Sequence, residues 1–138
     1  MGIRTKNLHH YIITLRSAGT LTAATDKDVA KALMAGYITN VVGKVTSGGT
    51  GSTNTIVDIN LNGTTIFAAA TKITFASTTG VASYSALSSE PIAVTQGSMF
   101  TLDVDSIALA PKNVAVQITV SRTPVAAAGN NENQEEVL

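Results

Sequence analysis

Three stretches of the chain alternate strictly between apolar and polar residues, which is typical of a β-strand with one buried and one solvated face. They are residues 55–61 (TIVDINL), 99–106 (MFTLDVDS) and 114–120 (VAVQITV). Their opposite faces, which include Asp58, Asp103 and Asp105, are predicted to be wet. The predicted core faces consist of Val57, Ile59 and Leu61; Phe100, Leu102 and Val104; and Val114, Val116, Ile118 and Val120.

Weaker patterns add further strands. Residues 9–15 are rich in β-branched and aromatic residues, and we expect this strand to end at Ala18-Gly19. Residues 37–45 predict a strand with Tyr37, Val41 and Val45 on one face. The stretch between them is ambiguous. Residues 20–25 favour a strand, whereas the helical spacing of Val29, Leu33 and Met34 leaves a short helix as the alternative.

Turn signals separate these segments. Asn62-Gly63 predicts a two-residue hairpin, because a type I′ turn needs positive φ at both central residues. Gln96-Gly97 predicts a second turn before Met99. With the short runs around residues 72–75 and 91–94 the count reaches about eight strands. The sequence therefore predicts an all-β fold, an antiparallel β-sandwich with a jelly-roll-like arrangement.

The two ends of the chain differ from its middle. We expect residues 1–17 to form an N-terminal arm and the first strand, residues 18–121 the sandwich, and residues 122–138 an extended tail. The arm is basic and the tail acidic, so the two ends are either solvated or able to link neighbouring copies. The charged residues that make them interface candidates are Arg4 and Lys6 in the arm and Glu132, Glu135 and Glu136 in the tail.

Composition narrows the possible functions. The formal net charge is zero and only 13% of the residues are charged, which argues against a nucleic-acid partner. There is no cysteine, and therefore no disulfide or thiolate chemistry. No apolar run reaches the roughly 18 residues of a membrane span, and the N-terminal segment is a poor secretory signal. We expect a soluble protein that is made inside the cell.

A glycine-rich stretch, SGGTGST at residues 47–53, invites comparison with phosphate-binding loops. It lacks the lysine of a Walker loop, the third glycine of a dinucleotide fingerprint, and the helix that both require. We therefore predict a flexible turn between two strands. Its glycines, Gly48, Gly49 and Gly51, are interface candidates because a loop tip can touch a neighbouring subunit.

Carboxylates offer the other candidate chemistry. Asp103 and Asp105 share one face of a strand, and Asp58 is expected on a neighbouring strand. Three such groups can bind a hard cation such as Ca²⁺, or two can act in glycoside hydrolysis, but alternating Asp on a solvated strand face is the favoured interpretation. Adjacent His9 and His10 point to opposite faces of a strand. No catalytic set is visible, so we expect neither an enzyme nor a cofactor.

The order of the motifs resembles a small β-domain of tailed-bacteriophage structural proteins. In that family a G-Y/T-I-T strand, a glycine-rich turn, a D-I/V-N-x-N-G-T-T-I hairpin, a G-D-x-x-x-x-D-V-D strand and a final V-x-V-x-I/V strand follow one another. One departure is Ser98, where the family often has Asp. The matching segments here are residues 36–39, 48–51, 58–66, 97–105 and 114–120.

The resemblance implies a capsid decoration (cement) protein. It would be a homotrimer on the capsid exterior, bound to the major capsid protein and made in the host cytoplasm. Residues 1–17 and 122–138 would contact the capsid or neighbouring copies. The alternative is a receptor- or carbohydrate-binding module of a head fibre, tail or baseplate, for which Tyr84 is the best aromatic platform.

Overall fold

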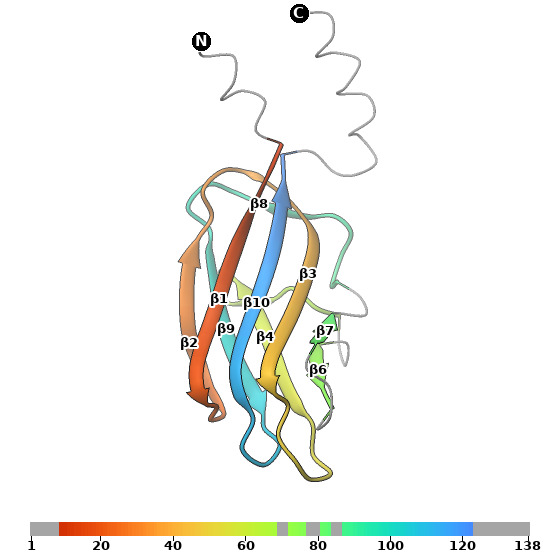
Figure 1. Cartoon of the computed structure of the whole chain (residues 1–138). Helices are drawn as coiled ribbons and strands as arrows, with labels where there is room; N and C mark the ends of the chain where they lie inside the picture. The colour runs from red at the N-terminus through yellow and green to blue at the C-terminus, as the bar shows by residue number, and fades with distance from the viewer. Residues whose placement is uncertain (1–8, 69–71, 77–80, 84–86, 123–138) are drawn as a thin grey trace, which may run out of the picture.

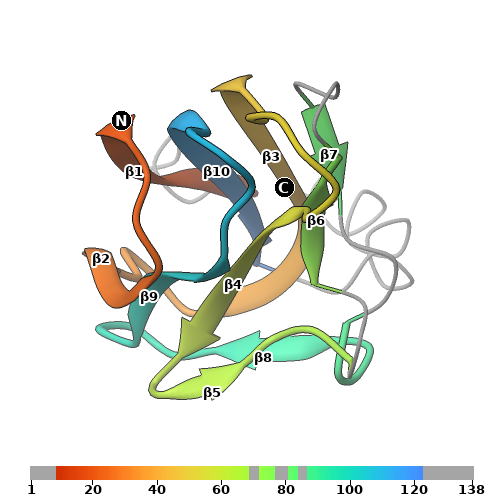
Figure 2. The ribbon, with the colours of Figure 1, turned by 90° about the horizontal axis from the view of Figure 1, so that it is seen from below.

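Two antiparallel β-sheets pack face to face in the computed structural model, which describes residues 9–68, 72–76, 81–83 and 87–122 (Figures 1 and 2). We call them sheet A and sheet B. In sheet A the order is β1 (His10–Thr20), β10 (Lys112–Ser121), β3 (Gly36–Ser47) and β7 (Val81–Ser83), and β8 (Ile92–Val94) also pairs with β3. In sheet B the order is β2 (Ala24–Lys31), β9 (Met99–Ser106), β4 (Thr55–Leu61) and β5 (Thr64–Thr65), and β6 (Ile73–Phe75) also pairs with β4.

This arrangement confirms the predicted antiparallel β-sandwich. The three strongly alternating segments are β4, β9 and β10, and their apolar sides form the core between the sheets. Apart from Leu61, which is partly buried, each residue predicted for those core faces is 2% exposed or less. The described residues hold ten strands instead of about eight, because pieces as short as β7 have no readable alternation.

The short helix considered around Val29 and Leu33 is wrong, because this part of the chain is the strand β2. It pairs with β9, with Val29 opposite Thr101 and Lys31 opposite Met99. Val29 and Leu33 are 48% and 62% exposed, and the buried side of this segment is supplied by Ala32. The helical spacing therefore did not mark a buried face.

Of the three residues predicted to share one face of β3, the first, Tyr37, is wrong. Asn40 pairs with Thr119 and Ile38 with Val120, so β3 has one extra residue there and the register shifts. Such a bulge reverses the alternation beyond it. Val41 and Val45 face the core as expected, but the residue that joins them is Ile38, and Tyr37 is only half-buried.

The first strand is longer than its sequence pattern suggests. β1 pairs residue by residue with β10 from His10 to Ser17 and, after an irregularity, again at Thr20, so it does not end at Ala18-Gly19. The expected boundary between residues 17 and 18 lies inside this strand. Its inward side chains, Ile13 and Leu15, belong to the core.

Both predicted turns are present. Asn62 and Gly63 have φ of 51° and 88°, and Leu61 pairs with Thr64 across them. Gly97 has a φ of 83° in the turn before β9. These two turns are joined, because the backbone N–H and the side-chain oxygen of Asn62 exchange hydrogen bonds with the backbone of Met99.

Candidate functional site

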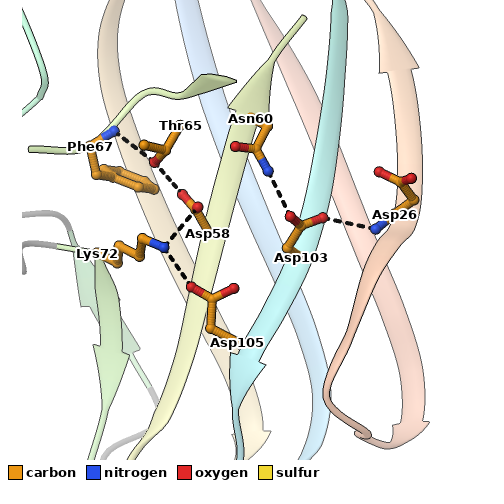
Figure 3. A network of polar contacts seen from close by, with 8 residues as sticks. All are labelled: Asp26, Asp58, Asn60, Thr65, Phe67, Lys72, Asp103 and Asp105. Carbon is orange, nitrogen blue, oxygen red and sulfur yellow. Dashed lines mark hydrogen bonds and ion pairs between the residues drawn. The ribbon is translucent and has the colours of Figure 1, made fainter. Parts of the chain in front are cut away.

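The three candidate carboxylates lie on the outer face of sheet B (Figure 3). Asp58 on β4 is directly opposite Asp103 on β9, and Asp105 follows on β9. This face is not simply wet as predicted, because Asp58 and Asp103 are only 5% and 8% exposed. Burying ionised carboxylates is costly unless each has partners, so the partners define what this cluster does.

Lys72 lies between two of these carboxylates. Its Nζ donates a hydrogen bond to Oδ2 of Asp105 at 2.6 Å and lies 3.0 Å from Oδ2 of Asp58. The second oxygen of Asp58 accepts a hydrogen bond from the Thr65 hydroxyl, whose oxygen in turn accepts one from the backbone N–H of Phe67. An ammonium group thus occupies the position between Asp58 and Asp105 where a cation would have to bind.

Asp103 serves a different purpose. Its two oxygens accept hydrogen bonds from the backbone N–H of Asp26 at 2.8 Å and from the side-chain amide of Asn60 at 2.7 Å. These donors lie on β2 and β4, on either side of β9. Asp26 has a φ of 53° at the point where the pairing of β2 with β9 is interrupted. Asp103 therefore supplies the acceptor that the backbone of the irregular edge strand needs.

The chemistry of the cluster is that of a structural ion-pair network. Within the described ranges no group of three or more His, Asp or Glu side chains is arranged to hold a metal ion. Hydrolysis would need two of these three carboxylates, and each already has partners: Lys72 and Thr65 contact Asp58, Lys72 contacts Asp105, and Asn60 and the backbone of Asp26 donate to Asp103. Hydrogen bonding to Asp105 raises the pKa of Lys72, with Asp58 adding to the increase and burial opposing it.

Sequence reasoning missed Lys72, although a signal for it exists. It is the one basic residue between Lys44 and Lys112, in a part of the chain that contains Asp58, Asp103 and Asp105. Its distance in sequence from all three hid the contact.

Replacing Lys72 by Met tests the network. The change leaves Asp58 buried with one remaining side-chain hydrogen bond and removes the charge between two carboxylates. We expect the free energy of unfolding to fall by about 1–2 kcal/mol in urea denaturation, less than for a fully buried pair because the Lys72 side chain is 30% exposed. The matched control is Lys31→Met on β2, an exposed site, for which we expect a change within about 0.5 kcal/mol. Equal stability of the two variants would contradict the assignment.

The same ion pairs predict a pH dependence. The pKa of Lys72 is raised above its ordinary value of 10.5, so the folded state holds this proton more tightly than the unfolded state. The resulting stabilisation is complete below that value and is lost as the pH rises through the higher folded pKa. The stability difference between wild type and Lys72→Met should therefore be constant from neutral to mildly alkaline pH and shrink above it. A stability difference that grows at alkaline pH would contradict a raised pKa of Lys72 in the folded state.

The glycine-rich loop after β3 is held more firmly than the predicted flexible turn. Thr50 and Leu109 exchange backbone hydrogen bonds of 2.8 Å, which joins this loop to the connection between β9 and β10. The hydroxyl of Thr55 accepts from the N–H of Ala108 and donates to the carbonyl of Gly48. Both loops lie at the end of the sandwich opposite the start of β1 and the end of β10 (Figure 1).

The three glycines of this loop differ in role. Gly48 and Gly49 are buried and Gly51 is exposed, so the first two have little surface for a neighbouring subunit. A Cβ on Gly49 would lie 2.7 Å from the carbonyl oxygen of Leu109, whereas one on Gly51 would meet nothing within 4 Å. Gly49 is needed for close packing inside the molecule, and Gly51 alone remains at the surface.

A pair of alanine substitutions separates backbone strain from packing. Gly49 and Gly51 have similar positive φ, 87° and 95°, so alanine is strained at both positions. We expect Gly51→Ala to cost about 1 kcal/mol of stability from strain alone and Gly49→Ala about 2–4 kcal/mol because of the added contact with Leu109. Thermal and urea unfolding measure both. Equal costs would show that the two loops are not packed as described.

The remaining candidates concern the ends of the chain and the aromatic residues. Arg122 donates its backbone N–H to the carbonyl of His9 at 2.7 Å, so the two ends of the sandwich chain lie side by side. Tyr11 is half-buried and donates its hydroxyl to the carbonyl of Met34. Among the described residues no helix is long and apolar enough to span a membrane. The candidates outside the described residues are Arg4, Lys6, Tyr84, Glu132, Glu135 and Glu136.

Fold and surface together define a small antiparallel β-sandwich whose polar clusters are structural. No family model and no curated protein matches the sequence. Among solved structures the chain is similar to one described as "Cyanophage Pam1 capsid asymmetric unit", with a TM-score of 0.53 and 17% identity over 83% of this chain and 87% of that chain. At this identity the similarity shows a shared fold.

Proposed function

We propose that this protein is a virion structural protein of a tailed phage that decorates and stabilises the capsid shell. The observation that carries the proposal is the structural match, which covers 83% of this chain and 87% of the chain from the cyanophage capsid. In this proposal the protein binds the major capsid protein on the capsid exterior, as a homotrimer, without a catalytic role. The trimer follows from the sequence resemblance to phage structural domains.

The strand connections support this class of fold. The first four strands alternate between the sheets, with β1 and β3 in sheet A and β2 and β4 in sheet B, and the last two strands, β9 and β10, again lie in different sheets. With the short strands β5 and β8 set aside, two four-stranded sheets remain, with the orders β1-β10-β3-β7 and β2-β9-β4-β6, and these orders support a jelly-roll-like arrangement. Jelly rolls are frequent in viral capsid proteins, although fold alone does not decide function.

The position of the chain ends supports binding through them. β1 begins and β10 ends at the same end of the sandwich, beside one another in sheet A (Figure 1). Segments that leave from adjacent points can reach the same surface. A decoration protein that binds the assembled shell better than free subunits stabilises the shell by mass action, and two extensions from one end allow one copy to contact more than one capsid subunit.

Deleting the ends tests this function. We expect a chain of residues 9–122 to retain the melting behaviour of the sandwich, because the strands and core lie within that range. It should lose binding to purified capsids lacking the protein, measured by co-sedimentation, and should no longer raise the temperature at which the shell releases its contents.

Two comparisons complete the experiment. Deleting residues 1–8 or 123–138 alone shows which end carries binding, and Lys31→Met in the full chain serves as the surface control. Binding of the doubly truncated chain at wild-type affinity, or absence of the protein from the head in an image reconstruction of intact particles, would overturn the proposal.

A further inference from the structure

Charges are divided unequally between the two sheets. The strands of sheet A contain only basic residues among the charged types, whereas those of sheet B are mainly acidic. A zero net charge for the whole chain hides this difference. The residues are Arg16, Lys44 and Lys112 in sheet A, and Asp26, Asp28, Asp58, Asp103 and Asp105 with Lys27 and Lys31 in sheet B.

Two of the basic residues flank a small one on the outer face of sheet A. Ala115 on β10 pairs with Arg16 on β1 and with Lys44 on β3, so the three form one row across the sheet. Strands are spaced by about 4.8 Å, which puts the two basic residues about 10 Å apart. Because Val114 and Val116 face the core, Ala115 faces outward as the floor between two long side chains.

This row forms part of a shallow groove of about 280 Å³. Asn113 lies at one end of the groove. Its side-chain oxygen accepts a hydrogen bond from the backbone N–H of Gly19, and its side-chain amide donates a hydrogen bond to the hydroxyl of Thr46. The floor is therefore short and rigid, and the walls carry positive charge. The lining residues are Arg16, Ser17, Ala18, Lys44, Val45, Thr46, Asn113, Val114 and Ala115.

The two basic side chains have no ion-pair partner within the described part of the chain, where the ion pairs are those of Lys72. Asp28 contacts the backbone of Arg16: its two carboxylate oxygens accept hydrogen bonds from the backbone N–H groups of Arg16 and Val29. Asp28 is thus committed to backbone groups at the sheet edge. Arg16 and Lys44 are exposed and available to a ligand with more than one negative charge.

The chain itself contains such a ligand. After Arg122 it has three glutamates, Glu132, Glu135 and Glu136, and no basic residue. β10 lies between β1 and β3 in sheet A, and Ala115 lies six residues before its last residue, Ser121, or about 20 Å back along the strand. The eleven residues from Ser121 to Glu132 span up to about 36 Å when extended, so the acidic segment can return to the groove.

We propose that the acidic segment 132–136 binds the groove between Arg16 and Lys44 of its own chain. Binding within the same chain is favoured over binding to a second copy, because a short linker holds the segment at an effective concentration of the order of millimolar near the groove. The contact joins carboxylates to exposed cations, so it is weak and screened by salt. It covers the outer face of sheet A in the free protein. The inference concerns the free protein and does not rest on the proposed capsid role.

Paramagnetic relaxation provides a direct test, because the chain has no cysteine and Val137→Cys creates a unique site for a nitroxide label. In the ¹⁵N-labelled full chain we expect broadening of the amide signals of Arg16, Lys44 and Ala115. The amides of Asp103 and Asp105 in sheet B should remain sharp. Raising the salt from about 0.1 to about 1 M shortens the screening length to about 3 Å and should abolish the broadening.

Charge variants identify the contact. Glu132→Gln, Glu135→Gln and Glu136→Gln together should remove the broadening, as should Arg16→Glu with Lys44→Glu. The matched control, Lys27→Glu with Lys31→Glu in sheet B, should retain it. Should the Arg16/Lys44 variant fail to fold, the glutamine variant carries the test, because its changes lie outside the strands.

Three results would overturn the proposal. The first is uniform broadening over both sheets, and the second is broadening that persists in the glutamine variant. The third is broadening in a mixture of two chains, one that carries the nitroxide and contains ¹⁴N and one that lacks the nitroxide and contains ¹⁵N. The last result would show that the segment binds a second copy. Because all measurements use the free protein, their outcome is separate from that of the capsid-binding experiment.

Discussion

Burial of the apolar faces of β10 in sheet A and β9 in sheet B within one core is the constraint on which the rest of the structure depends. β10 pairs with β1 and β3, and β9 pairs with β2 and β4, so these two strands position the four other long strands. Their inward side chains, among them Leu102 and Ile118, are fully buried. Burial of such side chains stabilises each by about 1.5–3 kcal/mol relative to exposure, and a shift of one residue would turn the apolar face of either strand outward.

The core leaves the two outer faces free to differ. On sheet B, Asp103 satisfies the irregular backbone of β2, and Asp58 and Asp105 share Lys72 (Figure 3). These contacts join the edge strand and the segment before β6 to the central strands. On sheet A the outer face carries cations with a small residue between them. A β-sandwich can thus present one face whose carboxylates are held by hydrogen bonds and ion pairs within the molecule and a second face with exposed cations, while both faces share the same core.

Prediction from the sequence succeeded where short-range periodicity and long-range packing agree. The alternation in β4, β9 and β10 identified the core faces, and Asn62-Gly63 identified its hairpin because few residues adopt positive φ at both positions. Prediction failed where a tertiary contact overrode the local pattern. Because β3 has one extra residue, Ile38 faces the core in place of Tyr37. The segment around Val29 is a strand because it pairs with β9. The carboxylate face predicted to be wet is a buried network because Lys72 pairs with its carboxylates.

By itself the sequence determined the fold class, the three main core strands and the tight turns, since these depend on residues that are neighbours or two positions apart. Only the tertiary structure decided which carboxylates are buried, that Gly49 packs against the backbone of Leu109, and that Arg16 and Lys44 flank Ala115. These features join segments separated by dozens of residues, and the register between strands sets them. Local periodicity carries the alternation of each strand but not its register with a distant partner.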